Sequence, residues 1–190
     1  MKRASKSMTV ITVITVVFFT HTLYAQVETG QKAPLFSAID DQGLTWNLGD
    51  HIGKQNIVLF FYPAAMTGGC TAQACGFRDQ QEQFAGVNAI VVGISGDDKE
   101  GLAIFKQVHQ LNFPLLSDLT GSIAKAYGVP TREGGSIVRT VNEVDVTLTR
   151  GITASRWTFV IDRNGEIAHI DKEVDAANDS QKVLDVLKNL

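Results

Sequence analysis

The sequence of 190 residues predicts a single α/β domain built around a central, largely buried sheet. Three apolar runs, 57–62, 89–94 and 157–161, are continuous rather than alternating, which is typical of strands buried on both faces. Between these runs, apolar residues recur at helical spacing. Strands that alternate with helices indicate a sandwich in which helices cover a sheet.

The predicted elements follow one another as strand, helix, strand, helix, short strand, helix, hairpin and helix. In chain order we expect strand 57–62, helix 70–84, strand 89–94, a helix capped by Asp97 or Asp98, strand 114–116, a helix after Ser122, a hairpin over 157–171 that turns at Asn164-Gly165, and a last helix ending near Leu190. This order fits a thioredoxin-like arrangement with a central mixed sheet, because the closing hairpin adds antiparallel pairing to parallel strands.

Two further segments extend this core. Residues 35–50 predict an N-terminal hairpin extension that turns at 41–43. Residues 131–135 are polar and glycine-rich, and we expect a loop there. Segments 137–141 and 144–148 predict an additional hairpin around Asn142-Glu143.

Residues 1–25 have the features of a secretory signal peptide. A basic start is followed by an uncharged run over 8–19, which is shorter than the ~20 apolar residues that span a membrane. We therefore expect cleavage after about Ala25, a folded domain over 26–190, and a periplasmic or secreted location. An uncleaved N-terminal anchor is the alternative.

The composition excludes several classes of protein. Hydrophobic residues make up 44% and charged residues 19%, which are ordinary values for a globular chain. The net charge is −3 and no segment concentrates Lys and Arg, so we expect no nucleic-acid partner. We also expect no stable membrane partner. The two cysteines, Cys70 and Cys75, are too few for a disulfide framework, which directs attention to their chemistry.

Cys70 occupies a position that favours a reactive sulfur. It follows Gly68-Gly69 and opens the expected helix, where free N–H groups and the helix dipole favour a thiolate, the nucleophilic form of cysteine. Thr67, three residues earlier, can place a hydroxyl beside the sulfur. A buried, unreactive thiol is the alternative for Cys70 taken alone.

The spacing to Cys75 bears on whether the two cysteines form a permanent disulfide. On a regular helix their Cα atoms would lie roughly 8.7 Å apart, whereas a disulfide needs ~4.4–6.8 Å. Either the segment is permanently irregular, or the helix unwinds when the bond forms. This favours a pair that cycles between a reduced helix and an unwound disulfide over a structural disulfide, which stays open as the alternative.

The residues around Cys70 resemble a known family. Residues 63–70 read Pro-Ala-Ala-Met-Thr-Gly-Gly-Cys, which is similar to the peroxiredoxin active-site pattern of Pro, three residues, Thr, two residues and Cys. The preceding Phe-Tyr and the following Cys-Gly-Phe-Arg-Asp at 75–79 resemble the PrxQ, or bacterioferritin-comigratory-protein, branch of the AhpC/TSA superfamily. The resemblance extends from Gly30 to the last helix.

The resemblance implies a role for each matching residue. Cys70 would be the peroxidatic cysteine, and Cys75 the resolving cysteine that closes an intramolecular disulfide. Thr67 would hydrogen-bond the peroxide, and Pro63 would shield and shape the pocket. Arg156, just before the third apolar run, would stabilise the thiolate and the charge that develops on the leaving oxygen.

The implied activity is a thiol-dependent peroxidase that reduces hydrogen peroxide or organic hydroperoxides. The implied electron donor is a thioredoxin-like or other dithiol reductant. Neither a metal nor another cofactor is needed, because the sulfur carries the chemistry. A monomer is expected, since the resolving cysteine is in the same chain.

The sequence departs from the family pattern in three places. Gly68 stands where proline is usual, which suggests a more mobile loop. Gln73 stands where this branch often has a glutamate that pairs with the arginine, so we expect a neutral partner that holds Arg156 less firmly. Residues 131–155 are longer than the corresponding family segment and could reshape access to the site or form a contact surface.

Two other functions fit parts of the sequence. A general thiol-disulfide oxidoreductase would use the same fold, but the chain lacks the Cys-x-x-Cys pair that favours it. A copper carrier could use Cys70, Cys75 and a distant His169, because soft thiolates suit Cu(I). Asp97 and its acidic neighbours are expected to be a solvated helix start rather than an acid/base pair.

Overall fold

The computed structural model of the chain describes residues 27–190, so the expected signal peptide and its cleavage point lie outside the described residues. The strands are β1 (Ser37–Asp40), β2 (Thr45–Asn47), β3 (Asn56–Phe61), β4 (Ala89–Ser95), β5 (Leu115–Ser117), β6 (Thr131–Val141), β7 (Val144–Ala154), β8 (Trp157–Ile161) and β9 (Ile167–Asp171). The helices are α1 (Gly68–Asp79), α2 (Gln81–Gly86), α3 (Lys99–His109), α4 (Ser122–Ala126) and α5 (Asp179–Leu187), with a 3-10 turn at Leu48–Asp50. Within 27–190, no helix is long and apolar enough to cross a membrane.

The central sheet is mixed, as the sequence predicts. Its strand order is β2-β1-β5-β4-β3-β8-β9. Strands β3, β4 and β5 run parallel, while β8 and β9 add antiparallel pairing at one edge. The N-terminal hairpin β1–β2 is also confirmed, and it joins the opposite edge by antiparallel pairing of β1 with β5.

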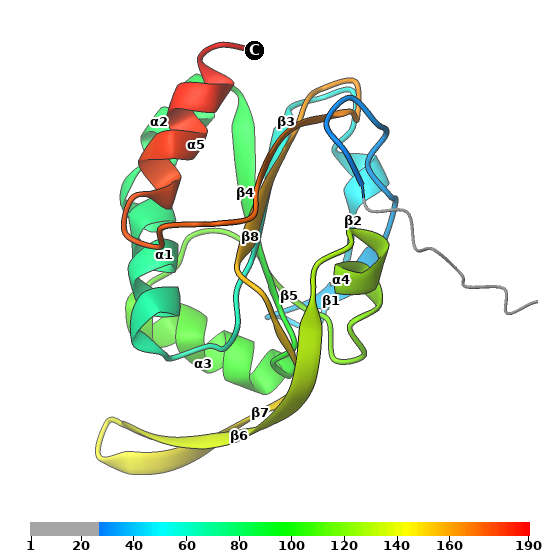
Figure 1. The fold of residues 1–190 in the computed structure, drawn as a ribbon. Coiled ribbons are helices and arrows are strands. Elements are labelled where there is room, and N and C mark those ends of the chain that lie inside the picture. The colour runs from blue at the N-terminus through cyan, green and yellow to red at the C-terminus, as the bar shows by residue number, and fades with distance from the viewer. Residues whose placement is uncertain (1–26) are drawn as a thin grey trace, which may run out of the picture.

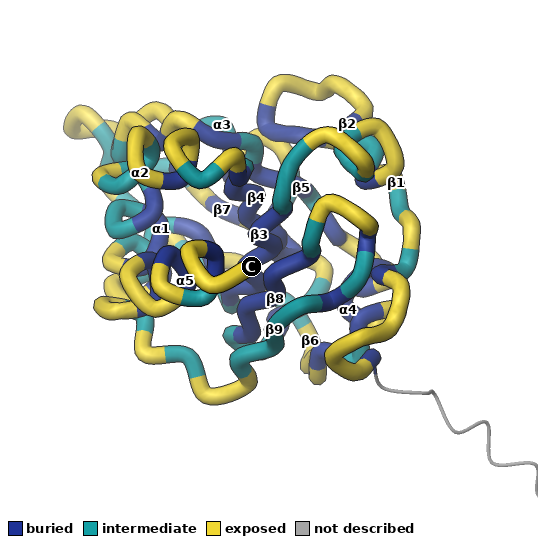
Figure 2. The backbone as a smooth tube through the Cα atoms, turned by 90° about the horizontal axis from the view of Figure 1, so that it is seen from above, coloured by how far each residue is buried: buried dark blue, intermediate teal, exposed yellow. Residues whose placement is uncertain are grey.

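Alternate residues of β3 fill two separate cores, one on each face of the sheet. Ile57, Leu59 and Phe61 pack toward the face covered by α4 and the N-terminal hairpin. Val58 and Phe60 pack toward the face covered by α1, α2, α3 and α5. Figure 1 shows this division, and Figure 2 shows that the residues of the central strands are buried whereas those at the outer turns are exposed. Burial on both faces explains why the run is continuously apolar.

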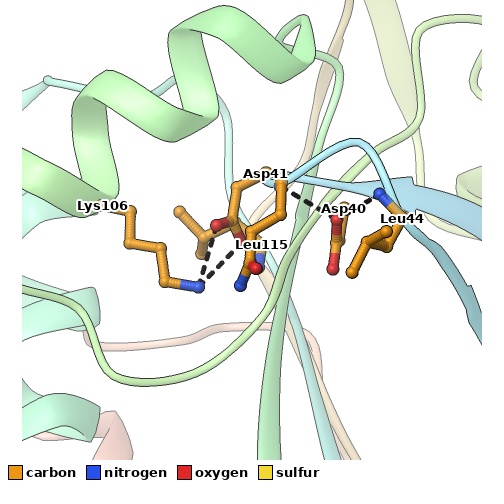
Figure 3. Close-up of polar contacts among 6 residues, drawn as sticks. Asp40, Asp41, Leu44, Lys106 and Leu115 are labelled. Atoms are coloured by element: carbon orange, nitrogen blue, oxygen red, sulfur yellow. Dashed lines mark hydrogen bonds and ion pairs between the residues drawn. The ribbon is translucent and has the colours of Figure 1, made fainter.

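The N-terminal hairpin is fastened to the helical side by a buried carboxylate (Figure 3). Asp41 forms an ion pair of 2.9 Å with Lys106 of α3, and its other carboxylate oxygen accepts the backbone N–H of Leu115 at 2.9 Å. Asp40 accepts the backbone N–H of Leu44 at 2.8 Å and closes the turn. These contacts connect the extension to α3 and β5.

The helix expected over 70–84 is two helices. It begins two residues earlier than expected and breaks at Gln80, whose φ of −106° and ψ of 12° are not helical. The chain then continues as α2. Phe77 and Phe84 are both buried, with ring centroids 5.6 Å apart, so the break keeps the apolar side chains of both helices in one core.

The loop expected at 131–135 is wrong, because these residues open strand β6. Strands β6 and β7 form a long hairpin that extends beyond the body of the protein below α3 (Figure 1). A Cβ on Gly134 would collide with the backbone of Arg150 and Gly151, so glycine here permits close strand pairing rather than a flexible loop. The turn at Asn142-Glu143 is confirmed, with positive φ values of 50° and 66°.

Candidate active site

Cys70 is a buried residue in the first turn of α1, with 1% of its surface exposed. The helix follows the loop that leaves β3, and the carbonyl of Thr67 accepts the N–H of Thr71 at 2.8 Å as the first helical bond. Both cysteines are free, and both lie on the unbroken helix. Five residues turn a helix by ~140°, so Cys75 lies on a different side of α1 from Cys70.

Arg156, the residue before β8, reaches Cys70 from the strand next to β3, because the last residue of β3, Phe61, pairs with Trp157 at the start of β8. Its Nη2 donates a hydrogen bond to the Cys70 sulfur at 3.4 Å. A Cβ on Gly69 would lie only 3.3 Å from the same nitrogen, so the missing side chain leaves room for the guanidinium over the start of the helix. A guanidinium at this position stabilises negative charge on the sulfur.

Gln73 holds the other side of the guanidinium. Arg156 donates through Nη1 to Gln73 Oε1 at 2.5 Å, and Gln73 Nε2 donates to Asp179 Oδ2 at 2.7 Å. Thr158 Oγ1 donates to the same carboxylate oxygen at 2.8 Å. The side chain that contacts Arg156 is neutral, as the sequence predicts. The Asp179 carboxylate lies behind it, hydrogen-bonded to Gln73.

Asp179 is a site residue that sequence reasoning missed. It lies in the first turn of α5, 106 residues from Gln73, with 1% of its surface exposed. Burial raises the pKa of Asp179, while the hydrogen bonds from Gln73 and Thr158 act in the opposite direction. An acidic residue at a helix start is common, and no motif in the sequence connects position 179 with the cysteines.

Thr67 and Pro63 lie on the loop between β3 and α1. The Thr67 hydroxyl donates its hydrogen to the carbonyl of Ala64 at 2.8 Å, so its oxygen keeps lone pairs that can accept from an O–H group. Pro63 lines a hollow of about 380 Å³ that is otherwise formed by residues 130–132 and 153–155. The two ends of segment 131–155 therefore lie beside Pro63.

Asp97 holds the same loop through a hydrogen bond to its backbone. It was expected to be solvated but is fully buried, and its Oδ2 accepts from the backbone N–H of Ala65 at 2.9 Å and from Ser95 Oγ at 2.8 Å. Burial raises the pKa of Asp97. The helix cap is instead Asp98, which accepts the N–H of Gly101 at 2.7 Å. The expected solvation is wrong because the carboxylate of Asp97 turns inward to the loop.

The hairpin β6–β7 contacts this loop from the outside. Arg139 Nε donates to the carbonyl of Met66 at 3.0 Å. Met66 has a positive φ of 58°, an unusual conformation for a residue with a side chain. The hairpin therefore fixes the backbone immediately before Thr67, a contact that the sequence did not reveal.

A second guanidinium, that of Arg78, lies near Cys75. Arg78 forms an ion pair of 2.7 Å with Asp79 and donates to the carbonyl of His109 at 2.5 Å. The hydrogen bond to Asp79 raises the pKa of Arg78, and Cys75 contributes in the same direction. Cys75 is partly exposed, unlike Cys70.

The structure does not bring together Cys70, Cys75 and His169, the residues that a copper carrier would use as ligands. His169 lies on β9 and lines a hollow with Lys182 and Asp185 of α5, while Cys70 contacts Arg156. Across residues 27–190, no group of three or more His, Cys, Asp and Glu side chains is arranged to hold a metal ion.

The fold and the site are those of a known family of proteins. Residues 29–170 match the AhpC/TSA family, and the chain belongs to that family. Within it, the chain is 35% identical over 164 residues to peroxiredoxin Bcp of Bacillus subtilis (strain 168), covering 86% of this chain and 97% of that protein. It is 39% identical over 147 residues to chloroplastic peroxiredoxin Q of Populus jackii, covering 77% and 61% of the two chains. The resemblance to PrxQ and Bcp peroxiredoxins is thus confirmed.

Solved structures give the same result for the fold. Peroxidoxin BcpB from Mycobacterium tuberculosis is 34% identical, with a TM-score of 0.72 over 87% of this chain and 99% of that one. A PrxQ mutant from Xylella fastidiosa is 25% identical, with a TM-score of 0.73 over 87% and 98%. The predicted thioredoxin-like fold is confirmed. The chain spans about three-fifths of the length of the chloroplastic relatives that it matches.

Proposed function

We propose that this protein is a thiol peroxidase that reduces hydrogen peroxide or organic hydroperoxides through Cys70. The observation that carries the proposal is the buried Cys70 sulfur at a helix start with the Arg156 guanidinium 3.4 Å away. The helix N-terminus and the guanidinium both favour a thiolate. The peroxiredoxin names of the relatives support the same activity.

In the first step, the Cys70 thiolate attacks one oxygen of the peroxide. A sulfur–oxygen bond forms and the O–O bond breaks, which leaves a sulfenic acid on Cys70 and releases water or an alcohol once the leaving oxygen takes up a proton. Arg156 stabilises the negative charge as it moves from sulfur to the leaving oxygen. The acceptor lone pairs of Thr67 orient the peroxide O–H.

In the second step, the sulfur of Cys75 attacks the sulfenic acid. A Cys70–Cys75 disulfide forms and water leaves. Helix α1 must open over this segment, because helical geometry keeps the two Cα atoms roughly 8.7 Å apart and a disulfide needs ~4.4–6.8 Å. A thioredoxin-like or other dithiol protein then reduces the disulfide, and a monomer suffices because both cysteines belong to one chain.

The test uses the reduced protein, freed of reductant and mixed with one equivalent of hydrogen peroxide. We expect both thiols of the wild type to disappear within seconds, with an intact mass two hydrogens lower. Cys75→Ser should instead accumulate a sulfenic acid that a dione reagent traps, and Cys70→Ser should stay inert. Thiols of the wild type that persist for minutes would contradict the proposal.

We further propose that residues 1–25 direct export and are removed after about Ala25. The basic start and the uncharged run over 8–19 support this. The full chain would be expressed in a bacterial host, and each cell fraction analysed by intact mass. A periplasmic or secreted product that begins near residue 26 is expected. Full-length chain in the cytosol would contradict export, and full-length chain in the membrane fraction would indicate the anchor.

A further inference from the structure

We propose that Asp179 is a positioning residue that holds Arg156 on the Cys70 sulfur by fixing the orientation of Gln73. The inference rests on the proposed function and concerns how this chain serves it without a carboxylate at position 73. The contacts run in one line from the sulfur: Arg156 at 3.4 Å, Gln73 at 2.5 Å from Arg156, and Asp179 at 2.7 Å from Gln73. Arg156 precedes β8 and contacts two residues of α1, Cys70 and Gln73, and Gln73 in turn connects α1 to Asp179 of α5.

The Gln73 amide can accept a hydrogen bond from Arg156 in only one of its two orientations. Arginine can only donate hydrogen bonds, so it needs the oxygen of Gln73 and is repelled by the NH2 group. An ionised carboxylate can only accept, so Asp179 requires the NH2 group on its own side. With Arg156 on one side and Asp179 on the other, the Gln73 amide has a single satisfactory orientation, and its oxygen faces the guanidinium.

Burial gives this arrangement its strength. Gln73 and Asp179 are 0% and 1% exposed, so water does not compete for their hydrogen bonds. Asp179 Oδ2 also accepts from Thr158 on β8, which fixes the carboxylate relative to the strand that follows Arg156. Oδ1 of Asp179 is buried and has no partner among residues 27–190, so its geometry depends on the two donors to Oδ2.

The charges around Asp179 come from several elements. Asp171 of β9 and Lys182 of α5 both act on its carboxylate, with opposite effects, and Arg156 lies beyond Gln73. No cation forms an ion pair with Asp179 among residues 27–190. The carboxylate therefore acts on the guanidinium through the amide between them.

The test measures how readily Cys70 reacts in a Cys75→Ser background, with iodoacetamide across a pH series and with hydrogen peroxide. Asp179→Ala removes the acceptor for Gln73, so we expect the peroxide rate constant to fall about tenfold, equivalent to ~1.4 kcal/mol. The pH midpoint of alkylation should move upward. Asp179→Asn keeps an acceptor oxygen and removes the charge, so a smaller loss of about threefold is expected.

Two controls separate positioning from general damage. Asp185→Asn makes the same change of charge on the same helix, at an exposed residue, and should leave rate and midpoint unchanged. Gln73→Glu places a carboxylate directly on Arg156 and makes Asp179 unnecessary. The double variant Gln73→Glu with Asp179→Ala should therefore recover the rate that Asp179→Ala loses.

The outcomes are distinct. Asp179 variants that match Asp185→Asn in both assays would overturn the inference, and so would a loss that Gln73→Glu fails to recover, since that loss would be structural. If Asp179→Ala fails to fold, Asp179→Asn and its double variant with Gln73→Glu decide by the same criteria. A wild type that does not consume peroxide would refute the proposed function, whereas alkylation would still test the link from Asp179 to Cys70.

Discussion

Replacing Gly69 with alanine should make helix α1 more stable and the protein a slower peroxidase. Gly69 lies in the first turn of the helix, directly under the guanidinium of Arg156. Alanine is a better helix former than glycine and loses less backbone entropy on folding. The helix propensity of alanine is by itself worth up to about 1 kcal/mol of the free energy of unfolding.

The loss of rate follows from the space above the helix. The new Cβ would lie 3.3 Å from Arg156 Nη2, closer than an ordinary contact, so the guanidinium must withdraw by a few tenths of an ångström. That nitrogen donates to the Cys70 sulfur at 3.4 Å, and its hydrogen bond would lengthen. If the longer hydrogen bond stabilises the transition state by about 1 kcal/mol less, the rate constant for the reaction with peroxide falls about fivefold.

Gly68→Ala provides the matched control. It makes the same substitution one residue earlier in the same helical turn, and its Cβ would meet nothing within 4 Å. Stopped-flow measurement of the reaction with hydrogen peroxide should give a rate constant about fivefold lower for Gly69→Ala and unchanged for Gly68→Ala. Urea denaturation should show Gly68→Ala to be more stable than the wild type and Gly69→Ala to gain less, because the weakened hydrogen bond from Arg156 to Cys70 offsets the helix propensity of alanine. Equal rates in the two variants would refute the role assigned to the space above Gly69.

Three further predictions concern the loop, the helix start and the buried carboxylates. Arg139→Ala frees the carbonyl of Met66 and should slow the reaction with peroxide about fivefold, with Arg139→Lys intermediate; an unchanged stopped-flow rate would show that the hairpin does not position the loop. Gly68→Pro places proline at the first helical residue, where it fits, and should raise the free energy of unfolding in urea by about 0.4–1 kcal/mol; a loss would mean that the site does not accept its ring. Burial raises the pKa of Asp97 and Asp179 above 3.8, so their contribution to stability is complete below that pH and is lost as the pH rises through the folded values. The thermal stability of Asp179→Asn should therefore increase relative to that of the wild type as the pH rises from about 4, and a difference between the two that does not change with pH would contradict the assignment.

The elements that the sequence predicted well are those whose pattern depends on burial. The continuous apolar run at 57–62 became the central strand β3, because both faces of that strand are covered. The prediction of a loop at 131–135 is wrong because glycine is common both in tight turns and where two strands pair closely, and the sequence alone does not distinguish the two. Only the position of Arg150 on the neighbouring strand shows that Gly134 serves the second use.

The candidate site was predictable where its residues are close in the chain. The segment 63–75 carries the family's pattern of proline, threonine and two cysteines, and the position of Arg156 before the third apolar run matches the family arginine. Asp179 and Arg139 were missed because each contacts the site from a distant element, by single hydrogen bonds that require the tertiary fold. An aspartate at a helix start and an arginine in a hairpin have ordinary surface explanations, so nothing local distinguishes them.

The unbroken helix α1 also bears on the oxidising strength of the proposed disulfide. Both cysteines lie on this helix with Gln73 between them, so oxidation must remove helical hydrogen bonds and packing that the reduced protein keeps. Free energy that stabilises the dithiol form raises the reduction potential, by about 30 mV for each ~1.4 kcal/mol. The helix therefore makes the disulfide easier to reduce. A substitution that weakens α1 without touching either sulfur should lower the potential and leave more of the protein oxidised at a given ratio of reduced to oxidised dithiol.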